Sequence, residues 1–242
     1  MNISIVIPTY NRVKLLKNCL ISLLRQTYPK DKFEVIVVDD GSSDSTEALI
    51  KSFAKGLNLK RLPQENQGQA VARNSGIKDS RGEIIAFIDD DCAADTHWLE
   101  NISKAYEVCP EAEIIQGSIN LGYSINPIHR THEAINRAAN ENRIIRAHAT
   151  DYALFFGPLN AAIKKSAILK YGLFFEESLA PREDIDLYRR MKKSGLDIIY
   201  AGEMSVMHRP NCSPIAFFNR FFNYGRGEYR LRKKWQDVDY AD

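Results

Sequence analysis

The chain has 242 residues, 44% hydrophobic and 26% charged, which is the composition of an ordinary globular protein with enough residues for a sizeable core. The formal net charge of +2 gives no support for a nucleic-acid partner, and the four widely spaced cysteines argue against a disulfide framework or zinc site. No apolar run approaches the roughly 18 residues of a spanning helix, and no signal peptide is evident. We therefore expect a cytoplasmic protein.

The first ninety residues alternate β-branched runs with segments whose apolar residues follow the helical period. The expected strands are 3–7, 33–38, 57–62 and 83–88, and the expected helices are 11–24, 44–54 and 67–78. Near-continuous apolar strands separated by helices predict an α/β fold with a mostly parallel sheet covered on both faces.

The second part of the chain is less regular. The expected strands are 113–119, 160–164, 197–201 and 205–208, and the expected helices are an exposed one over 128–146 and another over 183–193. An aromatic and basic segment follows from Ser213 onward. We expect one domain over 1–208 and a C-terminal helical extension over 209–242.

Polar motifs end three of the expected strands. They are Pro8-Thr9-Tyr10-Asn11, Asp39-Asp40-Gly41 and Asp89-Asp90-Asp91. Ligands bind at the carboxyl ends of strands in open α/β sheets, so we expect the motifs to share one rim. The patterns of a P-loop and of a dinucleotide-binding turn are both absent from the sequence.

The acidic run can be interpreted in two ways. Asp89 and Asp91 offer hard oxygen ligands at alternate positions, which suits Mg²⁺ or Mn²⁺ held together with substrate phosphates. The alternative is a solvated acidic turn before a helix capped by Asp95. Spacing alone does not decide between them.

Six segments in order resemble family 2 glycosyltransferases of the GT-A fold, a Rossmann-like three-layer α/β sandwich. They are I-V-I-P-T-Y-N-R, Q-T-Y-P, V-I-V-V-D-D-G-S-S-D-S-T, N-Q-G-Q-A-V-A-R-N-S-G-I, G-E-I-I-A-F-I-D-D-D and R-E-D-I-D-L-Y-R-R-M-K-K-S-G. The likeness spans about residues 3 to 208. It implies an inverting, metal-dependent enzyme that moves one sugar from a nucleotide-sugar donor to a hydroxyl acceptor.

The resemblance implies that the first two strand ends hold the nucleotide, which we expect to be UDP. Tyr10 would lie close to or stack on the uracil, and Asp39 would accept its N3–H. This contact favours uracil over cytosine, whose N3 carries no proton. Arg73 would lie near the diphosphate or the acidic run. The expected nucleotide-binding residues are Pro8, Thr9, Tyr10, Asn11, Asp39, Arg73, Asp89 and Asp90.

The resemblance also assigns the metal and the base. Asp91 would coordinate Mn²⁺ or Mg²⁺, and Asp89 would lie at the metal or the ribose. His208 could complete the metal site, although a lone histidine is more often structural. Asp184 would be the catalytic base, with Glu183 binding the acceptor or orienting Asp184. An isolated acidic pair there would be explained by the helix dipole alone.

Three further residues have weaker assignments. Gly157 and Asn160, in G-P-L-N, match a segment that could shape the donor-sugar or acceptor site. A turn glycine and a strand asparagine explain them almost as well. Arg226, in Y-G-R-G, could reach the pyrophosphate.

Between His208 and Trp235 the sequence has seven Arg or Lys residues against one acid. A helix with aromatic residues on one side and bases on the other suits an anionic membrane surface; the alternative is a helix that packs its Phe residues on the domain. The expected acceptor is a saccharide or lipid-linked saccharide of polysaccharide or glycolipid assembly. The protein would be cytoplasmic or peripheral on the inner membrane face, and a homodimer stays open.

The Q-x-x-R-W signature of processive relatives is missing, which predicts transfer of a single sugar. Two other functions stay open. A sugar nucleotidyltransferase would need a basic triphosphate-binding loop, for which Arg12 and Lys14 are thin support. A non-catalytic sugar-nucleotide-binding module is the other, and the intact Asp91 and Asp184 argue against it.

Overall fold

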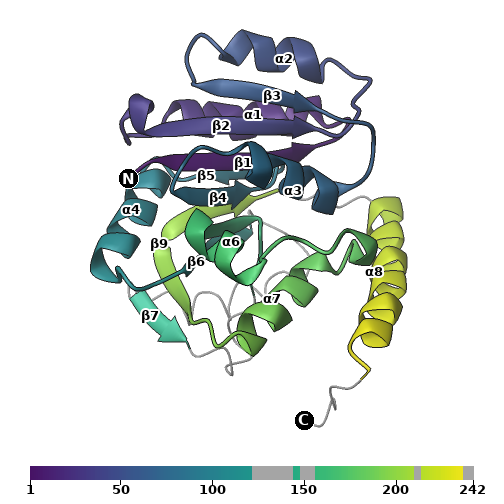
Figure 1. Cartoon of the computed structure of the whole chain (residues 1–242). Helices are drawn as coiled ribbons and strands as arrows, with labels where there is room; N and C mark the ends of the chain where they lie inside the picture. The colour runs from purple at the N-terminus through teal and green to yellow at the C-terminus, as the bar shows by residue number, and fades with distance from the viewer. Residues whose placement is uncertain (122–143, 148–155, 210–213, 237–242) are drawn as a thin grey trace.

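The computed structural model describes residues 1–121, 144–147, 156–209 and 214–236. These residues form one nine-stranded sheet with helices on both faces (Figure 1). Along the sheet the order is β3-β2-β1-β4-β8-β6-β9-β5, and β7 pairs with β9 off this path. The three-layer α/β architecture expected from the sequence is confirmed.

Four parallel strands make up the first part of the sheet. They are β1 (Ile3–Thr9), β2 (Phe33–Asp39), β3 (Leu59–Pro63) and β4 (Ile84–Ile88). β1 lies between β2 and β4, and Thr9 is in register with Asp39. The first polar motif therefore meets the second at one edge, as predicted.

The helices pack on the two faces of the sheet. α1 (Val13–Leu24), α2 (Thr46–Phe53) and α4 (Trp98–Val108) contribute to one apolar cluster. α3 (Gln69–Asp79), α6 (Lys165–Tyr171) and α7 (Glu183–Lys193) contribute to the cluster on the opposite face. Two short 3₁₀ turns, Lys30–Lys32 and Glu177–Leu179, complete these connections.

Antiparallel pairs enter in the second part of the sheet. Its strands are β5 (Cys92–Ala94), β6 (Ile114–Leu121), β7 (Ile144–Ala147), β8 (Asn160–Lys164) and β9 (Ile198–His208). β8 runs antiparallel to both β4 and β6, while β6 and β9 are parallel. β5 and β7 pair with β9 in the antiparallel sense.

Two sequence expectations are corrected in this part. The strands expected at 197–201 and 205–208 are one strand, because β9 stays paired with β6 across a bulge where Gly117 faces Ala201 and Ser118 faces Ser205. The prediction of a helix over 128–146 is wrong for its last three residues, because 144–147 form strand β7. Its other residues, 128–143, lie outside the described part of the chain.

Helix α8 (Pro214–Lys234) lies beside the segment that leads into α7. Gly227 approaches so closely that an added Cβ would be 2.8 Å from Cγ of Arg182. Leu231 is buried, and Trp235 donates its indole N–H to the buried Asp186. This face of α8 packs on the domain, but Phe221 and Phe222 are 53% and 69% exposed, so the packed face is not the Phe face that the sequence alternative named. Whether 209–242 is a separate extension of the 1–208 domain stays a prediction.

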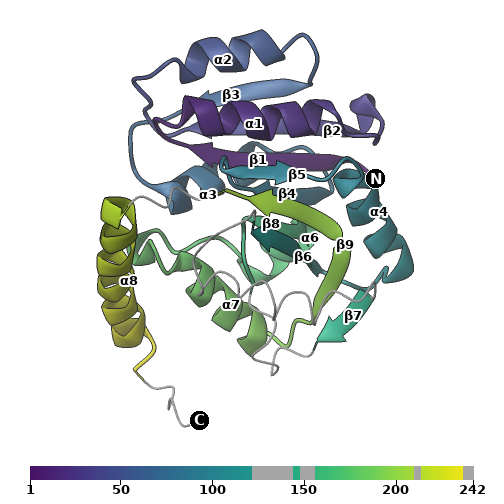
Figure 2. The same ribbon diagram turned by 180° about the vertical axis from the view of Figure 1, so that it is seen from behind.

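Figures 1 and 2 together show that the parallel strands point toward the side of the molecule on which α8 stands. The carboxyl edge of the sheet, where the polar motifs gather, therefore faces that helix. Among the described helices, none combines the length and apolar character needed to cross a membrane.

Candidate functional site

The end of β4 places the acidic run against the end of β1. Thr9 donates its hydroxyl to Oδ2 of Asp90 at 2.8 Å, and both side chains are buried. Burial raises the pKa of Asp90 to about 7, against the opposing effects of Arg12 and Thr9. Asp90 and Thr9, both expected at the nucleotide, thus also hold two parallel strand ends together.

Arg12, the residue directly before α1, contacts the acidic run. Its two terminal nitrogens lie 2.7 Å from Oδ1 of Asp90 and 2.7 Å from Oδ2 of Asp91. The sequence analysis missed Arg12 as a site residue. The available signal was a base directly after the strand-end motif P-T-Y-N, on the strand next to the one that ends in three acids.

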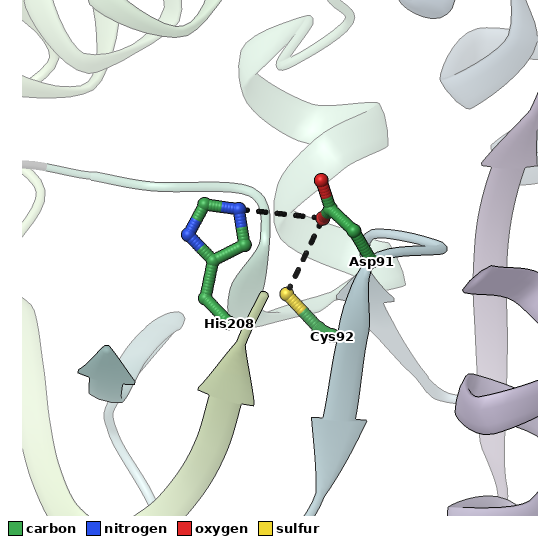
Figure 3. Close-up of side chains that lie close together, drawn as sticks. All are labelled: Asp91, Cys92 and His208. Atoms are coloured by element: carbon green, nitrogen blue, oxygen red, sulfur yellow. Dashed lines mark hydrogen bonds and ion pairs between the residues drawn. The ribbon is translucent and has the colours of Figure 1, made fainter. Parts of the chain in front are cut away.

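The start of β5 brings Asp91 to His208. Cys92 and His208 are register partners in the antiparallel pair of β5 and β9, and Nε2 of His208 lies 3.3 Å from Oδ1 of Asp91 (Figure 3). Although burial alone would raise it, His208 and Arg12 hold the pKa of Asp91 down, at about 2. Asp91 is therefore ionised, and its two oxygens face different partners.

Asp91 and His208 fit a divalent ion. Their donor atoms and the sulfur of Cys92 all lie within 4.8 Å of one another. Carboxylate oxygen and imidazole nitrogen are ligands that Mn²⁺ accepts. Burial and the nearby carboxylates of Asp89 and Asp91 raise the pKa of Cys92. Thiolate is a soft ligand, whereas Mn²⁺ and Mg²⁺ prefer oxygen ligands, so Asp91 and His208 are the better candidates.

Asp89 is tied to the opposite wall by Arg73. The guanidinium of Arg73 lies 2.8 Å from Oδ1 of Asp89 and 2.9 Å from Oε1 of Glu183. Arg73 is 2% exposed and its guanidinium lies over the ring of Phe175. Arg73 therefore joins the acidic run to the Glu183-Asp184 pair, and its two terminal nitrogens are both occupied by protein carboxylates.

Glu183 and Asp184 have different surroundings at the start of α7. Glu183 is 1% exposed and also accepts a hydrogen bond from the amide of Gln69 at 2.7 Å. Asp184 is less enclosed and accepts the backbone N–H of Ile185. Burial raises the pKa of Asp184 to about 6, helped by the charge of Glu183. Of the pair, Asp184 has the environment of a general base near neutral pH.

Asp39 ends β2 with both carboxylate oxygens in use. Oδ1 accepts the N–H of Ser42 at 2.9 Å, and Oδ2 lies 2.7 Å from a terminal nitrogen of Arg61. The neighbouring Asp40 accepts backbone N–H groups from Gln67 and Gly68. Asp40 thus shapes the loop before α3. Arg61, which the sequence analysis did not single out, forms an ion pair with Asp39.

The turn after β1 presents the remaining nucleotide candidates. Pro8 is half-buried, whereas the Tyr10 side chain is 45% exposed at this edge. Asn11 adopts a left-handed conformation with φ 52° and accepts the N–H of Ser43 at 2.8 Å. The exposed Tyr10 ring is free of the sheet and suited to stacking on a base.

The surface carboxylate of Asp44 accepts hydrogen bonds from the loops that follow β1 and β2. Asp44 accepts the N–H of Val13, at the start of α1, at 3.1 Å through Oδ2. Its other oxygen accepts the N–H of Thr46, at the start of α2, at 3.0 Å. The loops after β1 and β2 are therefore held at a fixed separation.

Gly157 and Asn160 use their polar groups inside the core. The Asn160 side chain accepts the indole N–H of Trp98 and donates to the carbonyls of Ser118 and Met204. Gly157 is buried and donates its N–H to Gln116. Asn160 is the register partner of Ile88, directly before the acidic run, but its amide group is used inside the core.

Arg226 is exposed on the face of α8 that points away from the α7 contact. It borders a shallow hollow of about 520 Å³ together with Phe221, Phe222 and Tyr229. Within the described part of the chain, the side-chain hydrogen bonds and ion pairs of the acidic run go to Thr9, Arg12, Arg73, Cys92 and His208 and not to Arg226.

Comparison with known proteins gives a consistent picture. The model of glycosyl transferase family 2 matches residues 4–172. The validoxylamine A glucosyltransferase of Streptomyces hygroscopicus subsp. jinggangensis is 29% identical over 86% of this chain and 56% of its own length. Glycosyltransferase AglE of Haloferax volcanii is 45% identical over 40% of this chain and 33% of its own length. The chain thus spans about half or less of these curated relatives.

Solved structures share the fold. Staphylococcus aureus TarS 1–349 in complex with UDP-GlcNAc has a TM-score of 0.74 at 21% identity, covering 87% of this chain and 60% of that one. The mannosyltransferase PcManGT from Pyrobaculum calidifontis, in complex with GDP-Man and Mn²⁺, has a TM-score of 0.71 at 20% identity, covering 96% and 64%. With the family match over most of the chain, the protein belongs to glycosyl transferase family 2.

Proposed function

We propose that this glycosyltransferase transfers one sugar from a UDP-sugar to a hydroxyl acceptor with inversion, using Asp184 as base and a divalent ion at Asp91 and His208. One observation carries the proposal. Arg73 joins Asp89 at 2.8 Å to Glu183 at 2.9 Å, so the nucleotide side and the base side share one buried ionic network. A donor held at the acids would therefore lie next to the base.

The nucleobase would lie at the edge formed by Tyr10 and Asp39. The carboxylate of Asp39 can accept a ring N–H, which uracil carries at N3 and guanine at N1. Structures with the same fold contain either base, since TarS is in complex with UDP-GlcNAc and PcManGT with GDP-Man. We choose uracil because the motif resemblance points to it, and the choice is open to direct measurement.

The diphosphate would lie over Asp91, His208 and Arg12. A divalent ion bound there would supply Lewis-acid stabilisation for the charge that builds on the departing UDP. Asp91 is fitted to hold it because its pKa of about 2 keeps it ionised. Arg12 contributes a further positive charge 2.7 Å from the same carboxylate.

Asp184 would remove the proton from the acceptor hydroxyl. The acceptor oxygen forms a bond to the anomeric carbon as the bond from that carbon to the UDP oxygen breaks on the opposite face. The proton ends on a carboxylate oxygen of Asp184, and one displacement inverts the configuration. A base whose pKa lies near 6 is ionised at neutral pH and still basic enough for this transfer.

A thermal-shift screen of UDP- and GDP-sugars with and without Mn²⁺ tests the proposal. We expect one UDP-sugar to raise the melting temperature only when Mn²⁺ is present, and Asp91→Ala to abolish that dependence. Slow release of UDP from the same sugar nucleotide would support transfer. Pyrophosphate production would instead support a nucleotidyltransferase, and stabilisation without any turnover would support a binding module.

We also propose a lipid-linked acceptor presented at an anionic membrane surface, as part of polysaccharide or glycolipid assembly. The exposed face of α8 supports this, because Phe222 and Tyr229 are 69% and 71% exposed beside the exposed Arg226. Helix α8 stands on the side of the molecule to which the parallel strands point.

Co-sedimentation with vesicles tests the membrane contact. We expect binding to phosphatidylglycerol vesicles and not to phosphatidylcholine vesicles, at low ionic strength. The double variant Phe222→Ser with Arg226→Gln should lose binding, whereas Lys14→Gln, an exposed base on α1, should keep it. Equal binding by both variants would place the contact elsewhere.

A further inference from the structure

Arg12 occupies a position that the stability of its own helix does not explain. It precedes Val13, the first residue of α1, and makes no side-chain cap hydrogen bond there. Positive charge at a helix N-terminus is unfavourable, and Ser, Thr, Asp or Asn are preferred at this position. The side chain instead extends to Asp90 and Asp91, with one nitrogen 2.7 Å from each carboxylate.

The charges of the acidic run divide between two arginines. Arg73 forms an ion pair with Asp89, and Arg12 forms ion pairs with Asp90 and Asp91. Arg73 is enclosed in the protein, but the Arg12 side chain is 36% exposed, so it lies on the solvent side of the acids. Arg12 is therefore a cation that an incoming ligand can reach at the acidic run.

Arg12 and His208 contact opposite oxygens of Asp91. His208 lies at Oδ1, and Arg12 lies at Oδ2. Arg12 can therefore keep its contact while the other oxygen serves as a ligand. The guanidinium of Arg12 would then repel a divalent ion that binds alone. A diphosphate is negatively charged, so the ion and the guanidinium would both attract it.

We propose that Arg12 makes metal binding depend on the nucleotide: it weakens uptake of the ion alone and strengthens uptake of the ion together with the diphosphate. This inference rests on the proposed function of the site. It assigns Arg12 as a positioning residue that holds Asp90 and Asp91 together, and as the source of a positive coupling between the two ligands. By linkage the coupling is reciprocal, so Mn²⁺ and UDP each raise the affinity of the other by the same factor.

Titration of Mn²⁺ by calorimetry or electron paramagnetic resonance, with and without saturating UDP, tests this coupling. We expect Arg12→Gln to bind Mn²⁺ alone about tenfold more tightly than the parent chain, and the gain in Mn²⁺ affinity from UDP to fall about tenfold, each a change of about 1.4 kcal/mol. Lys17→Gln removes the same charge from an exposed position on α1 and should change both quantities less than twofold.

Thermal unfolding of the same variants provides a second readout that needs no turnover. Arg12→Gln should melt below the parent chain without Mn²⁺ and regain most of the difference when Mn²⁺ is added. Arg12→Lys keeps the charge but not the two-pronged contact, and should retain most of the coupling. Should Arg12→Gln prove too unstable to titrate, an Arg12→Lys variant with wild-type coupling would support the charge argument and one with none would overturn it.

The outcomes separate this inference from the proposed function. If the parent chain binds UDP with Mn²⁺ and Arg12→Gln shows the same coupling, the role of Arg12 is wrong and the function stands. If neither chain binds Mn²⁺ under any condition, both are wrong.

Discussion

The two parts of the sheet carry their functional residues in different ways. In β1, β2 and β4 the strands are parallel, and the polar motifs lie at the carboxyl ends of these strands. In β5 and β9 the pairing is antiparallel, and His208 reaches Asp91 across more than a hundred residues of chain. The polar edge of the first part can therefore be predicted from local sequence. The second part adds chemical groups through long-range contacts.

The largest expected effect separates these two parts by function. Asp184→Asn removes the proposed base while leaving the β1, β2 and β4 edge intact. Transfer should fall on the order of 10²–10⁴-fold, while UDP affinity in Mn²⁺ stays unchanged. Measured kcat and calorimetric Kd for UDP check both. If instead UDP affinity fell and kcat did not, Asp184 would act in UDP binding and not as the base.

Arg73→Met tests the ionic connection between the parts. It leaves the 1% exposed Glu183 without its cation, so the free energy of unfolding should fall by about 3–5 kcal/mol. Urea denaturation measures the loss. Adding Glu183→Gln removes the uncompensated charge and should restore part of the stability; a loss below about 1 kcal/mol in the single variant would mean that the pair contributes little.

Asn160→Leu tests whether this strand residue of the second part is structural. It leaves the Trp98 indole and two backbone carbonyls without partners in the core, which should cost about 1–3 kcal/mol. The melting temperature should drop. The KM for the donor, assayed at a temperature well below the melting temperature, should stay the same. An altered donor KM at unchanged stability would restore the sugar-site interpretation.

The pH dependence of transfer refines the assignment of the base. Asp184 must be deprotonated to accept a proton, and its pKa is raised to about 6. The value of kcat/KM should therefore fall about tenfold per pH unit below 6 and level off above it. Asp184→Asn should remove this limb from its residual activity; a limb that persists unchanged would come from another group.

The smallest effect concerns the attachment of α8. Trp235→Phe removes the 2.9 Å hydrogen bond to Asp186, which also contacts Lys234 and Arg190. We expect a loss of about 0.5–1.5 kcal/mol in unfolding free energy, measured in urea. Tyr229→Phe, a change at the exposed face of the same helix, should have no effect. Equal losses in both variants would argue against the specific contact.

Local sequence predicted the strands that form the polar edge because their signals are local. Apolar runs ended at Thr9, Asp39 and Ile88 within two residues of expectation, and the helix over 183–193 was placed correctly. Periodicity and strand-end polarity suffice where each strand is followed by its own helix.

The remainder depends on pairings that no local pattern encodes. β5 has only three residues, too short for a periodic signal, yet it sets the contact between Asp91 and His208. The partners of Arg12 and Arg61 follow from which strands are neighbours. Asn160 matched a sugar-site segment, but only its burial shows that its amide is used inside the core.

Asp44 bears on how experiments on this protein are interpreted. Its exposed carboxylate joins the starts of α1 and α2, and its hydrogen bonds with Thr46 and Val13 hold its pKa down even though its slight burial acts the other way. Acid strong enough to protonate it would release both loops at once, without touching a nucleotide atom. If donor affinity falls at low pH, the cause can therefore be a change in the spacing of the two loops and not the loss of a contact to the donor. The same holds for a substitution of Asp44 that lowers activity.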